Sequence, residues 1–499
     1  MALLAIDQGT TGSTALLLSE DGRTLGRANR EFSQHFPSPG WVEHDLDDIW
    51  KSVVGSVDDA LRAAGLRGRD VAAIGITNQR ETTCAWDKAT GAPAHRAIVW
   101  QDRRTEPACR ALREAGHEPR VRALTGLVLD PYFSGTKMAW LLSNVDGLRA
   151  RAAGGSLALG TVDAFLVHRL SGGQALATDV TNASRTLLMN LETRDWDDEL
   201  LSLLDVPRAA LPEIVPSAGR IAVTRGFGAV PDGTPITGIA GDQQAALFGQ
   251  ACFAEGDVKC TYGTGAFVLV NTGARPTPSR HGLLTTVAWQ LGAAPTYALE
   301  GASFIAGAAV QWLRDGLGLI ERASDVEALA RTVESSDGVT FVPALTGLGA
   351  PHWDADARGL VCGLTRGTTR GHLARATLEG VAFSVADLVR AMAEDLGAPV
   401  GKLRVDGGAA ANDLLMQLQS DLSDVQVERP LELESTARGA AMLAGIGAGV
   451  FAGPREAAAI SRVDRTFTPA LSPERRAGEQ ARWAAAVRRA RGAPSTAHG

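Results

Sequence analysis

One pattern occurs twice in the chain, and it limits the possible folds more than any other feature. Residues 3–18 predict two apolar strands joined by Asp7-Gln8-Gly9-Thr10-Thr11-Gly12-Ser13, a turn rich in glycine and hydroxyl side chains. About 255 positions later, residues 258–271 predict two more strands, joined by Gly263-Thr264-Gly265. Two such units predict a duplicated architecture, with a boundary near residues 245–256.

Apolar strands alternate with helical patterns along the rest of the chain, which indicates an α/β protein. A chain of 499 residues is too long for one hydrophobic core. We therefore expect domains over residues 1–250 and 251–470, followed by a peripheral helix and a frayed tail over 471–499. The predicted strands cover 72–76, 97–100 and 235–240, and the predicted helices cover 102–115 and 137–146 and begin again near Asp242.

Composition excludes several classes of protein. The formal net charge is −7 and the 49 Lys and Arg residues are scattered, so no basic footprint for nucleic acid is expected. The five cysteines form no C-x-x-C pair and predict buried free thiols in a reducing compartment. The N-terminus lacks a basic segment, and no run of about 20 apolar residues occurs, so we expect a cytoplasmic protein without membrane insertion.

The first turn, residues 7–14, is a candidate phosphate site. Glycines let backbone N–H groups approach an anion, hydroxyls add donors, and Asp7 could hold Mg²⁺. An ordinary polar hairpin turn is the alternative. The chain lacks the P-loop pattern, since its nearest approach, Gly397 to Lys402, has the wrong spacing.

Three further segments have both a functional and a structural interpretation. Gly407 and Gly408 follow a strand and suit a nucleotide near a helix N-terminus, or simply a tight connection. Asp242 ends a buried strand, where α/β sheets bind ligands, or it caps a helix. Arg80 and Glu81 can reach one ligand only from a loop, as Thr77-Asn78-Gln79 suggests, and a surface ion pair is the alternative.

Ser134-Gly135-Thr136-Lys137 fits the S-x-x-K pattern of penicillin-binding enzymes. The companion patterns S-D-N and K-T-G are missing, and no export is expected. The sequence therefore argues against that hydrolase.

Taken together, these segments resemble the FGGY carbohydrate kinases, in the right order over about residues 3–450. Within the family they are most similar to members that phosphorylate glycerol. The matching segments are residues 7–11, 40–45, 75–83, 130–137, 241–250, 261–265 and 359–379.

The resemblance implies two actin-like α/β domains, of the ribonuclease H-like (ASKHA) type, that close over ATP and an acceptor in a cleft between them. It also implies roles for single residues. Arg80, Glu81, Tyr132 and Asp242, with Gln243 beside them, would hydrogen-bond glycerol between apolar walls made by Trp100 and Phe267. Asp242 would be the general base and Asp7 would help hold Mg²⁺. Nucleotide contacts would come from Thr10, Thr11, Gly12, Thr14, Thr264, Gly307, Gln311, Gly408 and Asn412.

The chain departs from the family pattern in two places. Family members often carry serine and arginine where this chain has Gly12 and Thr14, so ATP affinity would be weaker or a lysine elsewhere would substitute. Some bacterial relatives bind fructose 1,6-bisphosphate through a Gly-Gly-Lys-Gly-Gly-Thr-Arg loop, and others are phosphorylated on a nearby histidine. Residues 223–229 read Val-Thr-Arg-Gly-Phe-Gly-Ala, and residues 219–242 contain no histidine. We therefore expect neither regulation by fructose 1,6-bisphosphate nor regulation by histidine phosphorylation.

Three functions remain to be separated. The leading hypothesis is transfer of phosphate from ATP to glycerol, giving sn-glycerol 3-phosphate, by a homo-oligomer (dimer or tetramer). The second is a kinase of the same family for another small polyol or a ketose. The third is an actin-like ATPase that acts without an acceptor.

Overall fold

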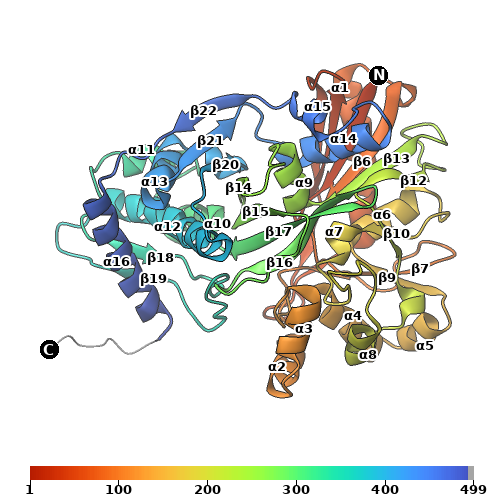
Figure 1. Ribbon diagram of the computed structural model, residues 1–499, viewed down its shortest axis with the longest axis horizontal. Coiled ribbons are helices and arrows are strands. Elements are labelled where there is room, and N and C mark those ends of the chain that lie inside the picture. The colour runs from red at the N-terminus through yellow and green to blue at the C-terminus, as the bar shows by residue number, and fades with distance from the viewer. Residues whose placement is uncertain (493–499) are drawn as a thin grey trace.

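The computed structural model describes residues 1–492, and their main feature is one mixed sheet of 13 strands with helices packed on it (Figure 1). The tail predicted to be frayed, residues 493–499, lies outside the described residues.

The first half of the sheet has the strand order 3-2-1-4-5 of a duplicated α/β unit. The two outer pairs, β3–β2 and β2–β1, are antiparallel, whereas β1–β6 and β6–β13 are parallel. In this order the strands are β3 (Thr24–Glu31), β2 (Gly12–Ser19), β1 (Ala2–Gln8), β6 (Val71–Asn78) and β13 (Pro235–Gly241).

The second half repeats this arrangement. Two antiparallel pairs are followed by two parallel pairs, as in the first half. The equivalent strands are β17 (Ala294–Ser303), β15 (Ala266–Gly273), β14 (Val258–Tyr262), β20 (Lys402–Asp406) and β21 (Gln426–Pro430). The predicted duplication and α/β fold are therefore confirmed.

The two halves join edge to edge. Strand β12 (Ala218–Val223) pairs with β13 on one side, and its residue Ala218 bridges Leu291 of β16 (Leu284–Leu291) on the other. The sheet is continuous because of this short parallel contact.

Helix α1 (Leu46–Ala64) covers the first half, and its ends follow from its sequence. The Asp45 side chain accepts hydrogen bonds from two backbone N–H groups of the first turn, and Gly65 ends the helix in the left-handed region at φ 64°. Ile49 and Val53 are fully buried against β2 and β3, and each contributes about 1.5–3 kcal/mol through this burial.

Helix α14 (Ser435–Gly447) comes late in the sequence but packs on strands of the first half, as Figure 1 shows beside β6. It crosses helix α9 (Asp242–Gly249) at very short range. A Cβ atom at Gly439 would collide with the carbonyl oxygen of Ala245, so glycine is required at this crossing. The two halves of the chain therefore share a core.

The second half is covered by α12 (Arg370–Leu396), and α16 (Pro473–Ala490) lies outside it. Trp483 of α16 stacks on Phe383 of α12 with ring centroids 5.1 Å apart, and its indole N–H donates to Asp387. This helix lies where the sequence predicts a peripheral one.

Predicted boundaries near residue 100 were wrong. The predicted strand 97–100 is limited to β8 (Ala97–Ile98), and the helix predicted over 102–115 is α2 (Glu106–Glu114). The buried Asp102 carboxylate accepts hydrogen bonds from backbone N–H groups on two different segments, which favours a turn over a helix here.

Other predicted strands and helices agree more closely with the structure. The strands predicted over 72–76 and 235–240 lie within β6 and β13. The helix predicted over 137–146 is α4, which covers Ser134–Asn144 and so begins three residues earlier.

All five cysteines are free thiols, four of them buried and Cys362 partly exposed. Within residues 1–492, every helix is too short or too polar to span a bilayer.

Candidate active site

The candidate site lies where three parallel strands of the first half end together. Gln8 of β1 pairs with Asn78 of β6, and Asn78 in turn pairs with Gly241 of β13. The first glycine turn, the loop after Asn78 and helix α9 therefore all start at one edge of the sheet, where ligands of α/β folds bind.

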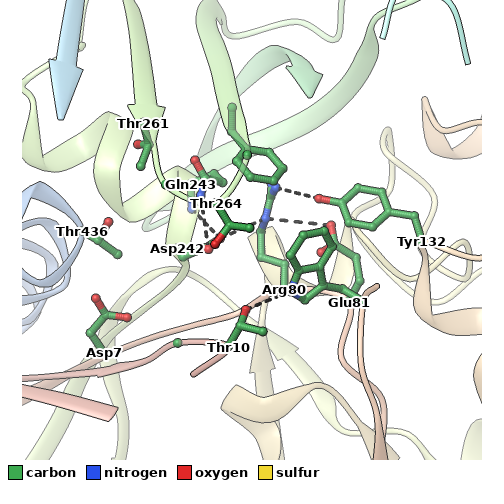
Figure 2. A pocket seen from close by; sticks show the side chains of 15 residues that line it. Asp7, Thr10, Arg80, Glu81, Tyr132, Asp242, Gln243, Thr261, Thr264 and Thr436 are labelled. Carbon is green, nitrogen blue, oxygen red and sulfur yellow. Dashed lines mark hydrogen bonds and ion pairs between the residues drawn. The ribbon is translucent and has the colours of Figure 1, made fainter. Parts of the chain in front are cut away.

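A cavity of about 230 Å³ opens at this edge and also reaches the second glycine turn (Figure 2). Asp7 and Thr10 of the first turn and Thr264 of the second contribute to its lining. Every residue predicted to hold the acceptor lines it as well: Arg80, Glu81, Trp100, Tyr132, Asp242, Gln243 and Phe267.

Arg80 is almost fully buried, so the alternative of a surface ion pair with Glu81 was wrong. Its guanidinium donates to both carboxylate oxygens of Glu300, at 2.5 and 3.0 Å, and to the Tyr132 hydroxyl at 3.2 Å. Its Nε lies 3.2 Å from Oδ1 of Asp242. Arg80 is therefore held from several sides in one orientation.

Glu81 faces the same cavity as its neighbour because its backbone is left-handed, at φ 59°. Strand β6 ends at Asn78, so Arg80 and Glu81 lie in the loop that the sequence suggests. A non-glycine residue in this region costs of order 1–3 kcal/mol and is typical of functional sites. Burial raises the pKa of Glu81. The positive charges of Arg80 and Arg185 partly offset this increase.

Arg185 and Glu300 complete this network, and the sequence analysis missed both. Arg185 donates to Glu81 at 2.7 Å and to Glu300 at 2.8 Å. Burial would raise the pKa of Glu300, but Arg185 and Arg80 outweigh it and hold the pKa at about 2. An acidic residue inside the apolar strand β17 was the available signal for Glu300.

The apolar wall is built from three aromatic rings. Trp100 meets Tyr132 and Phe267 edge to face, with centroids 5.8 and 6.1 Å apart. The indole N–H of Trp100 donates to the hydroxyl of Thr10 at 3.0 Å, which ties this wall to the first glycine turn.

Asp242 is the first residue of α9, and Gly241 rather than Asp242 occupies the cap position. The Asp242 side chain is 31% exposed, so it is open to the cavity. Its Oδ1 accepts a hydrogen bond from the Gln243 backbone N–H at 2.7 Å, and its Oδ2 accepts one from the Gln243 side chain at 3.2 Å.

Asp7, the predicted magnesium ligand, lines the same cavity. Burial, followed by the negative charge of Asp242, raises the pKa of Asp7 to about 8. A carboxyl in such a negative environment suits a divalent cation. The described residues contain no group of three or more metal-binding side chains.

A second cavity of about 440 Å³ adjoins the first and shares Gly263 and Thr264 with it. Its walls are more apolar, with Val310, Leu378 and Leu415 among them. Predicted nucleotide contacts from three separate segments meet here: Thr264, Gly307, Gln311, Gly408 and Asn412.

The glycine pair after β20 lies against the second turn. Gly407 has φ 85°, and a Cβ atom there would collide with backbone atoms of Tyr262. Asn412 then caps helix α13 (Asp413–Ser423) by accepting from the backbone N–H of Leu415. Gly407 therefore fits the tight connection, and a nucleotide contact at Gly408 and Asn412 stays a prediction.

Three predicted nucleotide contacts lie outside these cavities. Among the described residues that line the two cavities, Thr11, Gly12 and Thr14 do not occur. Thr14 is buried in β2, where its hydroxyl accepts a hydrogen bond from Asn29 at 2.9 Å. Its side chain is therefore occupied within the sheet.

Comparisons with known proteins agree with this geometry. Residues 2–249 match the N-terminal domain, and residues 258–448 the C-terminal domain, of the FGGY family of carbohydrate kinases. The chain is 56% identical to a glycerol kinase of Myxococcus xanthus over 98% of this chain and 99% of that protein. It is 57% identical to a glycerol kinase of Aromatoleum aromaticum, with 98% and 99% covered.

A solved structure, glycerol kinase of Plasmodium falciparum with ADP, superposes with a TM-score of 0.90 at 35% identity, covering 98% of both chains. A xylulose kinase of Lactobacillus acidophilus shares the fold, with a TM-score of 0.87 at 23% identity over 99% and 98% of the two chains. With both domains matched and the two cavities meeting at the repeated glycine turns, the chain belongs to the FGGY family of carbohydrate kinases.

Proposed function

We propose that the chain transfers the terminal phosphate of ATP to glycerol, giving sn-glycerol 3-phosphate. One observation carries this proposal: a cavity of about 230 Å³ that combines an aromatic wall with convergent polar groups opens into a larger cavity suited to a nucleotide. Relatives more than 50% identical over nearly the whole chain are named glycerol kinases, which supports the same acceptor.

Glycerol carries one hydroxyl on each of its three carbons. Arg80 and Tyr132 would donate to these hydroxyls, and Glu81 and Asp242 would accept from them. Trp100 and Phe267 would pack against the carbons. A site built to hydrogen-bond hydroxyls discriminates strongly against molecules that leave those groups unpaired.

Asp242 would act as general base. Its partly exposed carboxylate faces the cavity, and its two oxygens are already oriented by the backbone and side chain of Gln243. A carboxylate in this place can take the proton of the attacking hydroxyl as the phosphate moves in line.

Asp7 would hold Mg²⁺, which when bound neutralises charge on the phosphates. Backbone N–H groups of the two glycine turns would face the phosphates from opposite sides, since both turns line the same cavity. Closure of the two halves would keep water away from the phosphate.

The test measures ATP turnover by the purified protein with glycerol, with xylulose and without an acceptor. We expect turnover to depend on glycerol. Preference for the ketose would indicate another kinase of the family, and equal turnover without an acceptor would indicate an ATPase and contradict the proposal.

A further inference from the structure

A fully buried lysine lies directly behind the wall of the candidate active site. Lys259 is the second residue of β14, and its neighbours Val258 and Cys260 point to the opposite face, into the core of the second half. Burial lowers the pKa of Lys259. A buried ammonium requires hydrogen-bond partners, and the partners of this one lead to the site.

The ammonium of Lys259 contacts two residues that line the acceptor cavity. Its Nζ donates to Oε1 of Gln243 at 2.5 Å and to the Thr261 hydroxyl at 2.9 Å. Lys259 belongs to the second half of the chain, whereas Gln243 is the second residue of helix α9. The contact therefore joins the second half to the helix that carries Asp242.

The contact also decides which way the Gln243 amide points. The oxygen and nitrogen of an amide are similar in shape, so hydrogen-bond partners determine the orientation. An ammonium only donates, so the amide oxygen faces Lys259. The amide nitrogen then faces Asp242 and donates to its Oδ2 at 3.2 Å, as Figure 2 shows for this pair.

We propose that Lys259 is a positioning residue, which fixes the Gln243 amide so that it orients the Asp242 carboxylate. Its kinetic consequence rests on the proposed function. In this arrangement Asp242 is held at both oxygens, because Arg80 and the Gln243 backbone N–H face Oδ1. Without Lys259 the amide oxygen loses the donor that holds it, so the Gln243 side chain is no longer fixed in the position that places its N–H group at Oδ2.

The first experiment replaces Lys259 by methionine, which keeps an unbranched side chain of nearly the same length but removes the charge and the donors. We expect kcat to fall about 10- to 100-fold, the usual effect of losing a residue that orients a catalytic group. The KM for glycerol should stay within about threefold, because Lys259 does not contact the acceptor.

Two controls separate positioning from general damage. Val258→Ala disturbs the same strand on its opposite face, so it should lower Tm and leave kcat unchanged. The pair Gln243→Met and Gln243→Met/Lys259→Met should have nearly equal kcat, since Lys259 acts through the amide that both variants lack. Additive losses of kcat in the double variant would overturn the proposal.

Asp406, at the end of the adjacent strand β20, is attracted to Lys259 and loses its cation in the methionine variant. If that variant does not fold, Gln243→Glu carries the test. A glutamate keeps the contact with Lys259 but has no N–H group for Asp242, so kcat must fall. An unchanged kcat in Gln243→Glu, or in folded Lys259→Met, would overturn the proposal.

Crystal structures of the wild-type protein and of Lys259→Met test the geometry whichever acceptor is used. We expect the contact between the Gln243 amide and Asp242 to be lost in the variant, and its retention would overturn the proposal. Failure of the proposed function appears separately, as wild-type turnover that does not depend on glycerol.

Discussion

The guanidinium of Arg80 donates to both carboxylate oxygens of Glu300, and this pair links the loop after β6 to strand β17 of the second half. Both side chains are almost completely buried. The pair therefore has two roles, because it connects the halves of the sheet and holds a side chain of the acceptor cavity in place.

Glu300→Gln should reduce stability and acceptor binding together. It removes the charge that compensates Arg80 and Arg185, and breaking a buried ion pair typically costs about 3–5 kcal/mol. Urea unfolding should show this loss, and the KM for glycerol should rise because Arg80 is no longer held. In contrast, Glu199→Gln removes an exposed partner of Arg120 and should cost less than about 1 kcal/mol. Equal losses in the two variants would contradict the assigned role of Glu300.

Asp242→Asn should leave the fold intact and lower kcat by roughly 10²–10⁴-fold, the usual scale for a lost general base. The variant keeps the size of the side chain, and its one oxygen can still accept from the Gln243 backbone N–H group, although its amide nitrogen cannot accept from the Gln243 side chain. Circular dichroism and Tm check the fold, and steady-state turnover with glycerol checks the rate. Near-wild-type turnover would remove Asp242 from the role of base.

The sequence predicted the residues that line the acceptor cavity because each lies beside a recognisable glycine turn or in a segment shared with the family. It did not place Arg185 or Glu300 in the site, since their function depends on contacts between segments far apart in the chain, and the acidic residue in an apolar strand was the one signal for Glu300. Glu300 lies more than 200 positions after Arg80, and the pairing of β17 with β15 and β16 brings it to the guanidinium of Arg80.

Thr14 shows the opposite kind of error, because the family pattern assigned it to the nucleotide site and the structure places it outside both cavities. A family pattern places position 14 in the phosphate turn, but turn geometry depends on which residues enter the strand. Here β2 begins at Gly12, so Thr14 pairs with Asn29 of β3.

The oligomeric state depends on contacts between copies of the chain. Neither a sequence pattern nor the structure of a single chain decides these contacts, so the homo-oligomer stays a prediction.

Phe267→Ala should mainly raise the KM for glycerol, by about 10-fold, equivalent to about 1.4 kcal/mol. The ring packs against the acceptor in both the ground state and the transition state, so kcat should change little. Steady-state kinetics at saturating ATP measures both constants. An unchanged KM would show that Phe267 does not contact the acceptor.

Binding of the magnesium nucleotide should release a proton near neutral pH. With a pKa of about 8, Asp7 is mostly protonated at pH 7, and metal binding requires the ionised carboxylate. Calorimetry in buffers of different ionisation enthalpy should find about one proton released at pH 7 and almost none above pH 9. Asp7→Asn, or nucleotide with EDTA, should abolish this release. Heats independent of the buffer in the wild-type protein would contradict the assignment of Asp7.

His44 should contribute a loss of stability as the pH drops from about 6.5 toward 4. Burial, with a smaller effect of His35, lowers the pKa of His44 from 6.5 to about 4. Above pH 6.5 the ring is neutral in both the folded and unfolded states, so it adds no pH dependence. Between these values only the unfolded chain takes up the proton, which costs up to about 1.4 kcal/mol per pH unit.

The effect of His44 can be isolated by comparing urea midpoints of the wild-type protein and His44→Gln at pH 7, 6 and 5. Asp163 works in the opposite direction, because burial and then Asp179 raise its folded pKa to about 6, so its protonation favours the folded state as the pH falls. Asp163 is common to both proteins, so the difference between their midpoints reports His44. That difference should narrow steadily below pH 6.5, and a constant difference would mean that His44 takes up its proton equally well in the folded protein.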